Sequence, residues 1–214
     1  MERRNKPSKF VSVFVKITGL VAALIFFKPS VKYTDKKERR MRLSGPLILM
    51  SNHKSLLDFA LYYMIFPFNS LRFLIAEVMY NKGKAFAWFL NALGGIKVDR
   101  DSFDFGFISD SVEVLDNGGI LGVFPEGQLP RGGKMSPFKP SLVIIALKTH
   151  APILPVYTNG SYGLFKRARV IIGEKIILND YTDTDSPSGN EIARLNDILL
   201  AKILELKASE EKAA

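Results

Sequence analysis

A histidine and an aspartate, His53 and Asp58, are separated by four residues in the segment MSNHKSLLDFA. A carboxylate that binds one imidazole nitrogen fixes the tautomer and leaves the other nitrogen free as a general base. Five steps along a regular helix rotate the chain by about 500°, so the two side chains could not meet on one continuous helix. We therefore expect His53 in a turn before a helix and Asp58 in its first turns. The alternative is purely structural. In it His53 caps the start of the helix, and Asp58 is an acidic residue in the first turn that the helix dipole stabilises.

No protein nucleophile accompanies this pair. The chain has no cysteine and only two histidines, so thiol nucleophiles and thiolate metal sites are excluded, and we expect no metal site. The segment NGSYG, residues 159–163, has Asn159 where a nucleophile elbow requires glycine, and we interpret it as a turn. The attacking group would then be a hydroxyl or an amine of the substrate. The second histidine, His150, is expected to end a helix and is assigned no chemistry.

Two further segments place charged residues where strands are expected to end. GVFPEGQLPRGGK contains Glu126, Gly127 and Arg131, in a loop flexible enough to approach a phosphate that arginine can bind bidentately. GGIKVDRD contains Lys97 and Arg100, again beside a short apolar run. Ligands of α/β proteins bind at the carboxyl ends of the strands, which favours a binding role for both segments. Taken singly, a segment like the first is more often an ordinary turn than a site, and the alternative for the second is an exposed edge with an ion pair.

Short apolar runs alternate with helical stretches from residue 46 onward, and this alternation predicts an α/β fold with a mixed, largely parallel sheet flanked by helices. The runs expected as strands are Leu47–Met50, Leu71–Ala76, Ile96–Val98, Gly119–Phe124, Pro152–Tyr157 and Ala168–Gly173. The stretches expected as helices are Ser55–Ile65, Lys84–Leu93, Phe105–Asp116, Pro140–Thr149 and Pro187–Lys207.

The net charge of +9 is confined to the N-terminal fifth of the chain. Residues 1–42 carry 12 Lys or Arg against three acids, and the remainder is balanced at 18 against 18. This segment also contains the apolar run of residues 10–27. A basic segment around an apolar run is typical of a protein bound to an anionic membrane, and it argues against nucleic acid as a partner. We therefore expect a membrane-anchoring helical segment at 1–42 and an α/β domain at 43–214. A signal peptide or an ordinary buried helix are the alternatives for the apolar run.

The order of these segments is more specific than any one of them. H-x-x-x-x-D at 53–58, then GGIKVDR, FPEG and PILPVY, resembles the four sequence blocks of the lysophosphatidic acid acyltransferases, the 1-acyl-glycerol-3-phosphate acyltransferase family of glycerolipid acyltransferases. The resemblance covers roughly residues 45–160. It implies that His53 deprotonates the acceptor hydroxyl and that Asp58 orients it. It also implies that Arg100 holds the acceptor phosphate, that Glu126 and Gly127 belong to the block that shapes the acceptor site, and that Pro155 lines the acyl-donor side. Lys97 and Arg131 are further candidate substrate-binding residues, because they are the other cations of these segments.

The resemblance further implies an acyl thioester, acyl-CoA or acyl-carrier protein, as co-substrate, a lysophospholipid as acceptor and no cofactor. It places the protein on the cytoplasmic face of the cell membrane. The third block commonly continues E-G-T-R-S, whereas Leu129 stands here at the arginine position. Either Arg131 reaches the phosphate from a reshaped loop, or the acceptor is a different lysophospholipid or another hydroxyl or amine. A non-catalytic membrane-binding module would leave His53 and Asp58 unexplained, and a hydrolase would lack its serine elbow.

Overall fold

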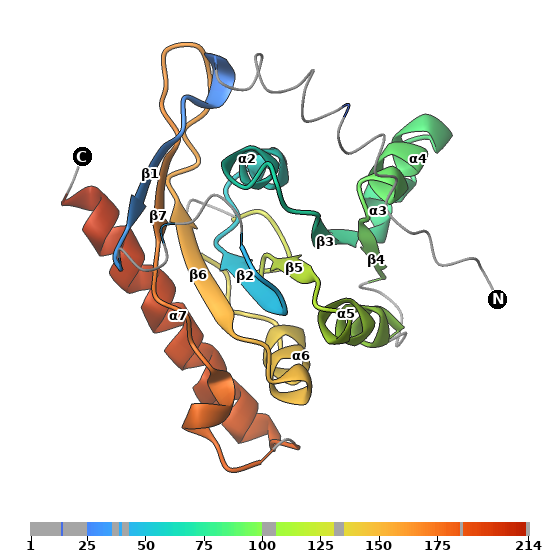
Figure 1. The fold of residues 1–214 in the computed structure, drawn as a ribbon, viewed down its shortest axis with the longest axis vertical. Helices are drawn as coiled ribbons and strands as arrows, with labels where there is room; N and C mark the ends of the chain where they lie inside the picture. The colour runs from blue at the N-terminus through green and yellow to red at the C-terminus, as the bar shows by residue number, and fades with distance from the viewer. Residues whose placement is uncertain are drawn as a thin grey trace.

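The chain folds as a seven-stranded sheet between two layers of helices (Figure 1). The computed structural model describes residues 14, 25–35, 39, 43–99, 106–130, 135–184 and 186–212. The strands are β1 (Ser30–Tyr33), β2 (Leu47–Ser51), β3 (Leu71–Ala76), β4 (Ile96–Val98), β5 (Ile120–Val123), β6 (Ile153–Thr158) and β7 (Arg169–Ile172). The helices are α2 (Asp58–Ile65), α3 (Glu77–Tyr80), α4 (Lys84–Ala92), α5 (Gly106–Asp116), α6 (Ser141–Thr149), the 3₁₀ helix η2 (Leu178–Tyr181) and α7 (Gly189–Glu211).

The strand order is β1-β7-β6-β2-β5-β3-β4, and all neighbouring pairs are parallel except β6 and β7. The carboxyl ends of β2, β5 and β6 therefore meet at one edge of the sheet. Each of these central strands is buried on both faces, as their continuous apolar sequences predict. This confirms the mixed, largely parallel α/β fold.

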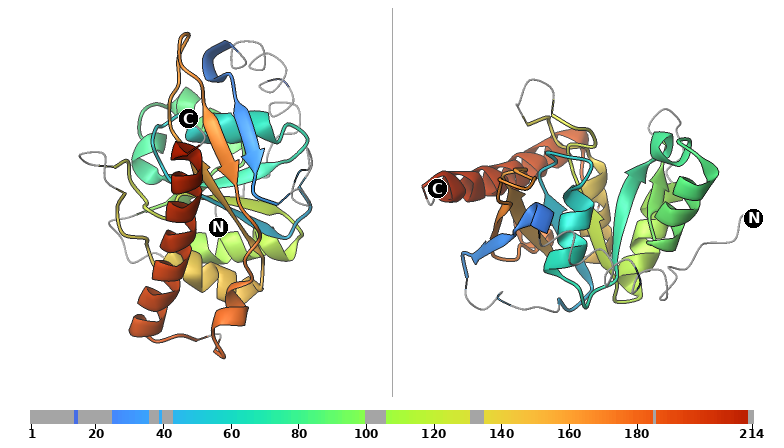
Figure 2. Two further views of the ribbon diagram at one scale, coloured as in Figure 1. Left: turned by 90° about the vertical axis from the view of Figure 1, so that its left-hand side faces the viewer. Right: turned by 90° about the horizontal axis from the view of Figure 1, so that it is seen from above.

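Two apolar clusters fill the space on either side of the sheet. One lies under α2, with Leu61 and Phe66 fully buried, and the other lies under α5, α6 and α7, with Leu142 and Leu199 fully buried. Figure 2 shows the same division from two further directions, with the long helix α7 crossing one face of the sheet. The cluster under α2 fixes this helix against the sheet. The position of the loop between β2 and α2 is thereby determined.

The element bounds agree with expectation for some strands and differ at the start of α2 and at the edge strand β1. β3 and β4 have the expected bounds, whereas α2 begins at residue 58 rather than 55. β1, residues 30–33, was not expected, and it pairs in parallel with β7. Because β1 lies within the segment 1–42, the sheet begins before the domain boundary that we expected at residue 43.

The expected membrane helix at residues 10–27 lies largely outside the described residues, which there comprise only Phe14 and residues 25–27. In the described part of the chain, no helix has both the length and the apolar character that a membrane span requires. The helical membrane segment of the expected fold thus has no support from the described residues.

Candidate active site

His53 and Asp58 form a hydrogen-bonded pair at the carboxyl end of β2. His53 Nδ1 lies 2.9 Å from Asp58 Oδ2. His53 belongs to the turn after β2, and Asp58 is the first residue of α2, which is the arrangement that the four-residue spacing predicted. Asp58 is fully buried, whereas the His53 side chain is 16% exposed. Since Nδ1 donates to the carboxylate and no described residue bonds Nε2, Nε2 is available to accept a proton.

The Asp58 carboxylate accepts four hydrogen bonds. Besides His53, the backbone N–H groups of Lys54 and Ser55 donate to Oδ2 at 2.7 and 2.9 Å, and the Tyr162 hydroxyl donates to Oδ1. Burial, reinforced by the negative charge of Asp58, holds the pKa of Tyr162 far above its ordinary value, so Tyr162 remains a neutral donor. Four donors compensate the cost of burying the carboxylate and fix its orientation.

An aromatic stack fixes the plane of the imidazole. The His53 ring lies on Phe124 with centroids 4.3 Å apart and an interplanar angle of 16°, and Phe124 stacks in turn on Phe73 at 5.6 Å. Phe73 can occupy this position because its neighbour across the strands is Gly122, where a Cβ atom would lie 2.2 Å from the Phe73 ring. The stack leaves the imidazole little freedom to rotate away from Asp58.

Glu126 holds the backbone of the histidine. Its side chain is buried, and its two oxygens accept hydrogen bonds from the backbone N–H groups of His53 and Ser136, each at 2.9 Å. Gly127 follows with a φ of 65°, a left-handed conformation that permits the turn after β5. The structure therefore brings Glu126 and Gly127 next to His53, and Glu126 acts there as a positioning residue.

The ends of β2 and β6 are joined by Asn52, whose side chain makes a pair of hydrogen bonds with the backbone of Thr158. Asn52 Nδ2 donates to the Thr158 carbonyl at 2.9 Å, and the Thr158 N–H donates to Asn52 Oδ1 at 2.8 Å. Two residues after Thr158, Gly160 packs so closely on Lys54 that a Cβ atom there would lie 2.3 Å from the Lys54 Cβ. These contacts hold the turn of residues 159–163 against the His53 loop.

The structure describes one of the three cations that were expected to bind the phosphate. Lys97 lies on the edge strand β4, where its ammonium group is 2.9 Å from Glu77 Oε1. Its side chain is half-exposed, and its strand ends at the same edge of the sheet as β2. Arg100 and Arg131 lie outside the described residues.

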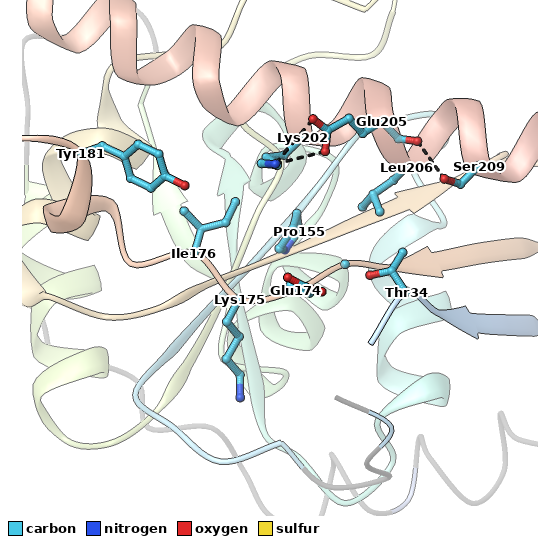
Figure 3. Close-up of a pocket in the computed structure, with 11 residues that line it drawn as sticks. Thr34, Pro155, Glu174, Lys175, Ile176, Tyr181, Lys202, Glu205, Leu206 and Ser209 are labelled. Carbon is cyan, nitrogen blue, oxygen red and sulfur yellow. Dashed lines mark hydrogen bonds and ion pairs between the residues drawn. The ribbon is translucent and has the colours of Figure 1, made fainter. Parts of the chain in front are cut away.

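Pro155 is not brought together with His53. It lies in the middle of β6 and contributes to a cleft of about 340 Å³ on the face of the sheet covered by α7. Figure 3 shows Pro155 there with Thr34 and with the paired Lys202 and Glu205 of α7. Its strand neighbour Val156 faces the opposite cluster, under α2. Nothing in this placement tests its expected contact with the acyl donor.

Three contributors were missed by the sequence analysis: Tyr162, Phe124 and Asn52. Asn52 precedes His53 directly, and Phe124 precedes the Pro-Glu-Gly segment, so both lay within the recognised blocks. Tyr162 lies 104 residues from Asp58 in the chain. It belongs to the NGSYG segment, residues 159–163, which we interpreted as a turn. The turn is confirmed, but only the structure shows that it carries the donor to Asp58.

A buried carboxylate, an oriented imidazole and an available Nε2 are the features that a general base requires. A family model described as "Acyltransferase" matches residues 30–159. The chain belongs to this acyltransferase family. The match begins at the first residue of β1 and ends in the turn after β6, and it includes every described residue of the site except Gly160 and Tyr162.

Relatives of this acyltransferase include the 1-acyl-sn-glycerol-3-phosphate acyltransferase of Bacillus subtilis, 32% identical over 124 residues, which are 56% of this chain and 60% of that protein. The chloroplastic enzyme BAT2 of Brassica napus is 23% identical over 155 residues, 72% of this chain and 43% of that protein. The human enzyme named beta is 23% identical over 127 residues, 59% of this chain and 46% of that protein. The acyltransferase chain thus spans only about half the length of these relatives.

A solved structure has the same fold. The crystal structure of the 1-acyl-sn-glycerophosphate acyltransferase PlsC from Thermotoga maritima aligns with a TM-score of 0.62 and 24% sequence identity. The alignment covers 94% of this chain and 79% of that chain. At this level of identity the likeness establishes the acyltransferase fold alone.

Proposed function

We propose that this chain transfers a fatty acyl group from an acyl thioester to the free hydroxyl of 1-acyl-glycerol-3-phosphate, which gives phosphatidic acid. The observation that carries the proposal is the His53–Asp58 pair, with Nδ1 bound to a buried carboxylate and Nε2 available. Family membership and the names of the relatives support this reaction class.

In the proposed reaction, His53 Nε2 takes the proton of the acceptor hydroxyl while the hydroxyl oxygen attacks the thioester carbonyl. The tetrahedral oxyanion collapses, the carbon–sulfur bond breaks, and the thiolate leaves with the proton returned by the imidazolium. Asp58 stabilises the imidazolium, and Tyr162 and two backbone N–H groups keep Asp58 oriented. The acyl group passes directly to the acceptor, so the chain needs no nucleophile of its own.

We assign the acceptor phosphate to Arg100, Lys97 and Arg131, which would neutralise it at the edge of the sheet where His53 lies. Lys97 would have to exchange its contact with Glu77 for the phosphate. Glu126 and Gly127 shape the acceptor side by fixing the His53 backbone. Pro155 is assigned to the acyl-donor side.

The thioester donor is proposed to be acyl-CoA or acyl-carrier protein, with no further cofactor. Residues 1–42 would hold the enzyme on anionic lipids at the cytoplasmic face of the cell membrane, where its lysophospholipid resides. Leu129 favours a second candidate, transfer to another lysophospholipid or to a different hydroxyl or amine acceptor. Its side chain is 37% exposed and apolar where relatives commonly place a guanidinium.

The proposal is tested by supplying one acyl-CoA and one acyl-carrier-protein thioester with a panel of acceptors and measuring release of free thiol. We expect release to depend on lysophosphatidic acid, with phosphatidic acid as the product. Release that depends on another lysophospholipid would establish the second candidate. Release without any acceptor would instead identify a hydrolase and contradict both.

A further inference from the structure

Four exposed apolar side chains gather where the β6–β7 hairpin meets the short helical segment at residues 25–27. Phe165 is fully exposed at 100%, Leu164 is 59% exposed, and Ile25 and Phe26 are 52% and 37% exposed. We call these four, with the exposed cations Lys28, Lys166 and Arg167, the hairpin patch. An apolar cluster held out in solvent is costly unless another surface covers it.

The patch is a folded structure rather than a loose loop. The Gly163 N–H donates to the Phe26 carbonyl at 2.9 Å, and the Ala168 N–H donates to the Phe27 carbonyl at 2.8 Å. The Lys28 ammonium donates to the Leu164 carbonyl. Beneath them Phe27 is buried and packs edge-on against Tyr162, with ring centroids 4.9 Å apart. The backbone therefore holds Leu164 and Phe165 outward.

The charge of the patch has one sign. Neither the segment 25–34 nor the segment 159–169 contains an acidic residue. Among the described residues, none of the patch cations Lys28, Lys166 and Arg167 pairs with a carboxylate. Apolar side chains ringed by cations fit a surface with an anionic outer layer and an apolar interior, which is the layering of a phospholipid bilayer.

The patch also lies at the edge of the sheet that carries the site. The hairpin follows the carboxyl end of β6, which runs parallel to β2, and His53 follows the carboxyl end of β2. In Figure 1 the hairpin and residues 25–27 project together at the top of the molecule, beyond α2. Leu164 stands two residues from Tyr162, the donor to Asp58.

We propose that the hairpin patch is a second membrane-docking surface, which inserts Leu164 and Phe165 among the headgroups of an anionic bilayer. Docking there turns the carboxyl edge of the sheet toward the lipid, so that an acceptor lipid enters beside His53. Residues 164–167 of the hairpin act in addition to residues 1–42, of which Ile25, Phe26 and Lys28 form part of the same patch. This proposal goes beyond the proposed acyl transfer, because binding of the patch to a membrane can be measured without any reaction taking place.

The absence of cysteine from the chain allows a direct test. Phe165→Cys in the full chain is labelled with an environment-sensitive fluorophore, and Ala193→Cys, exposed at the amino end of α7 and remote from the hairpin in Figure 1, serves as the matched control. With vesicles of phosphatidylcholine and phosphatidylglycerol, we expect the label at 165 to shift to the blue and to become protected from an aqueous quencher. The label at 193 should not change.

Two results would overturn the proposal. A label at 165 that stays accessible to the quencher while the chain is bound to vesicles would mean that residues 1–42 dock alone. A label already protected before vesicles are added would mean that another part of the chain, or a second copy of it, covers the patch.

Vesicle affinity provides an independent measurement. The variant Lys166→Gln/Arg167→Gln should bind phosphatidylglycerol vesicles about 25-fold more weakly, since each cation near the surface contributes about fivefold. Phe165→Ser should weaken binding about tenfold. The matched control Leu204→Ser removes a 46% exposed apolar side chain on α7 and should leave affinity unchanged.

Thiol release from detergent-dispersed lysophosphatidic acid should persist in every variant, so loss of docking and loss of the proposed reaction are distinguishable.

Discussion

The Tyr162 hydroxyl donates a hydrogen bond to Asp58 Oδ1, although 104 residues separate the two in the chain. Asp58 Oδ2 meanwhile binds His53 Nδ1. The turn after β6 thus orients the carboxylate from the side opposite the imidazole. Tyr162, Asp58 and His53 therefore form a relay of three hydrogen-bonded side chains, of which only His53 reaches the substrate in the proposed reaction.

Tyr162→Phe tests this relay, because it deletes one hydroxyl and keeps the ring that packs against Phe27. A hydrogen bond to a charged group contributes about 1.5–3 kcal/mol, so we expect kcat to fall about tenfold with KM nearly unchanged. The control Tyr181→Phe alters an exposed tyrosine and should retain full activity. Equal kcat in the two variants would remove Tyr162 from the positioning role.

Glu126→Gln tests the clamp on the His53 backbone. The amide of glutamine can accept from only one of the two N–H groups that now share the carboxylate. We expect the free energy of unfolding to fall by about 1–3 kcal/mol, together with kcat. The matched variant Glu205→Gln removes a carboxylate that is 63% exposed and should change stability by less than about 0.5 kcal/mol. Urea denaturation of both variants measures the difference.

Gly160→Ala tests the contact between the β6–β7 turn and the His53 loop. Gly160 has a φ of 66°, and an added Cβ would lie 2.3 Å from the Lys54 Cβ. The left-handed conformation alone costs an alanine about 1–2 kcal/mol, and the clash must displace Lys54 beside His53. We expect lower stability and lower kcat. Gly189→Ala, where no atom lies within 4 Å of the added Cβ, should lower neither. If stability and kcat fell in both variants, the cause would be a general effect of replacing glycine with alanine rather than the contact between Gly160 and Lys54.

Alkaline pH should destabilise the fold through buried tyrosines. Burial, with the charges of Glu210 and Glu211, raises the pKa of Tyr157 to about 12, and burial raises the pKa of Tyr80 to about 12. Since the unfolded value is 10.0, the folded state holds these protons more tightly. The resulting stability is fully present below pH 10 and is lost as pH rises through 12. The urea midpoint should therefore fall above pH 10, and less steeply in Tyr157→Phe. If the urea midpoint of Tyr157→Phe fell with pH as steeply as that of the unaltered chain, the assignment to Tyr157 would be contradicted.

The centre of the sheet could be predicted from sequence, because strands buried on both faces appear as continuous apolar runs such as Leu47–Met50. The edge strand β1 could not. β1 has four residues, SVKY, and follows an apolar run, so its pattern merged with the expected anchor. α2 begins three residues later than expected because the N–H groups of Lys54 and Ser55 turn back to the Asp58 carboxylate.

The site was predictable as far as local spacing determines it. The four residues between His53 and Asp58 excluded a single continuous helix and required the turn that the structure contains. The contact of Asp58 with Tyr162 was not predictable, since it depends on β6 lying beside β2. The burial of Glu126 was likewise not evident, because a Pro-Glu-Gly segment is typical of an exposed turn.

Replacement of the imidazole measures the central claim most directly. His53→Asn retains a side-chain N–H that can donate to Asp58 but supplies no base, and His150→Asn makes the same change at the left-handed residue that ends α6. Thiol release dependent on lysophosphatidic acid should fall by about 10²–10⁴-fold in His53→Asn, with unfolding unchanged, and should persist in His150→Asn. Full activity in a folded His53→Asn protein would contradict the proposed general base.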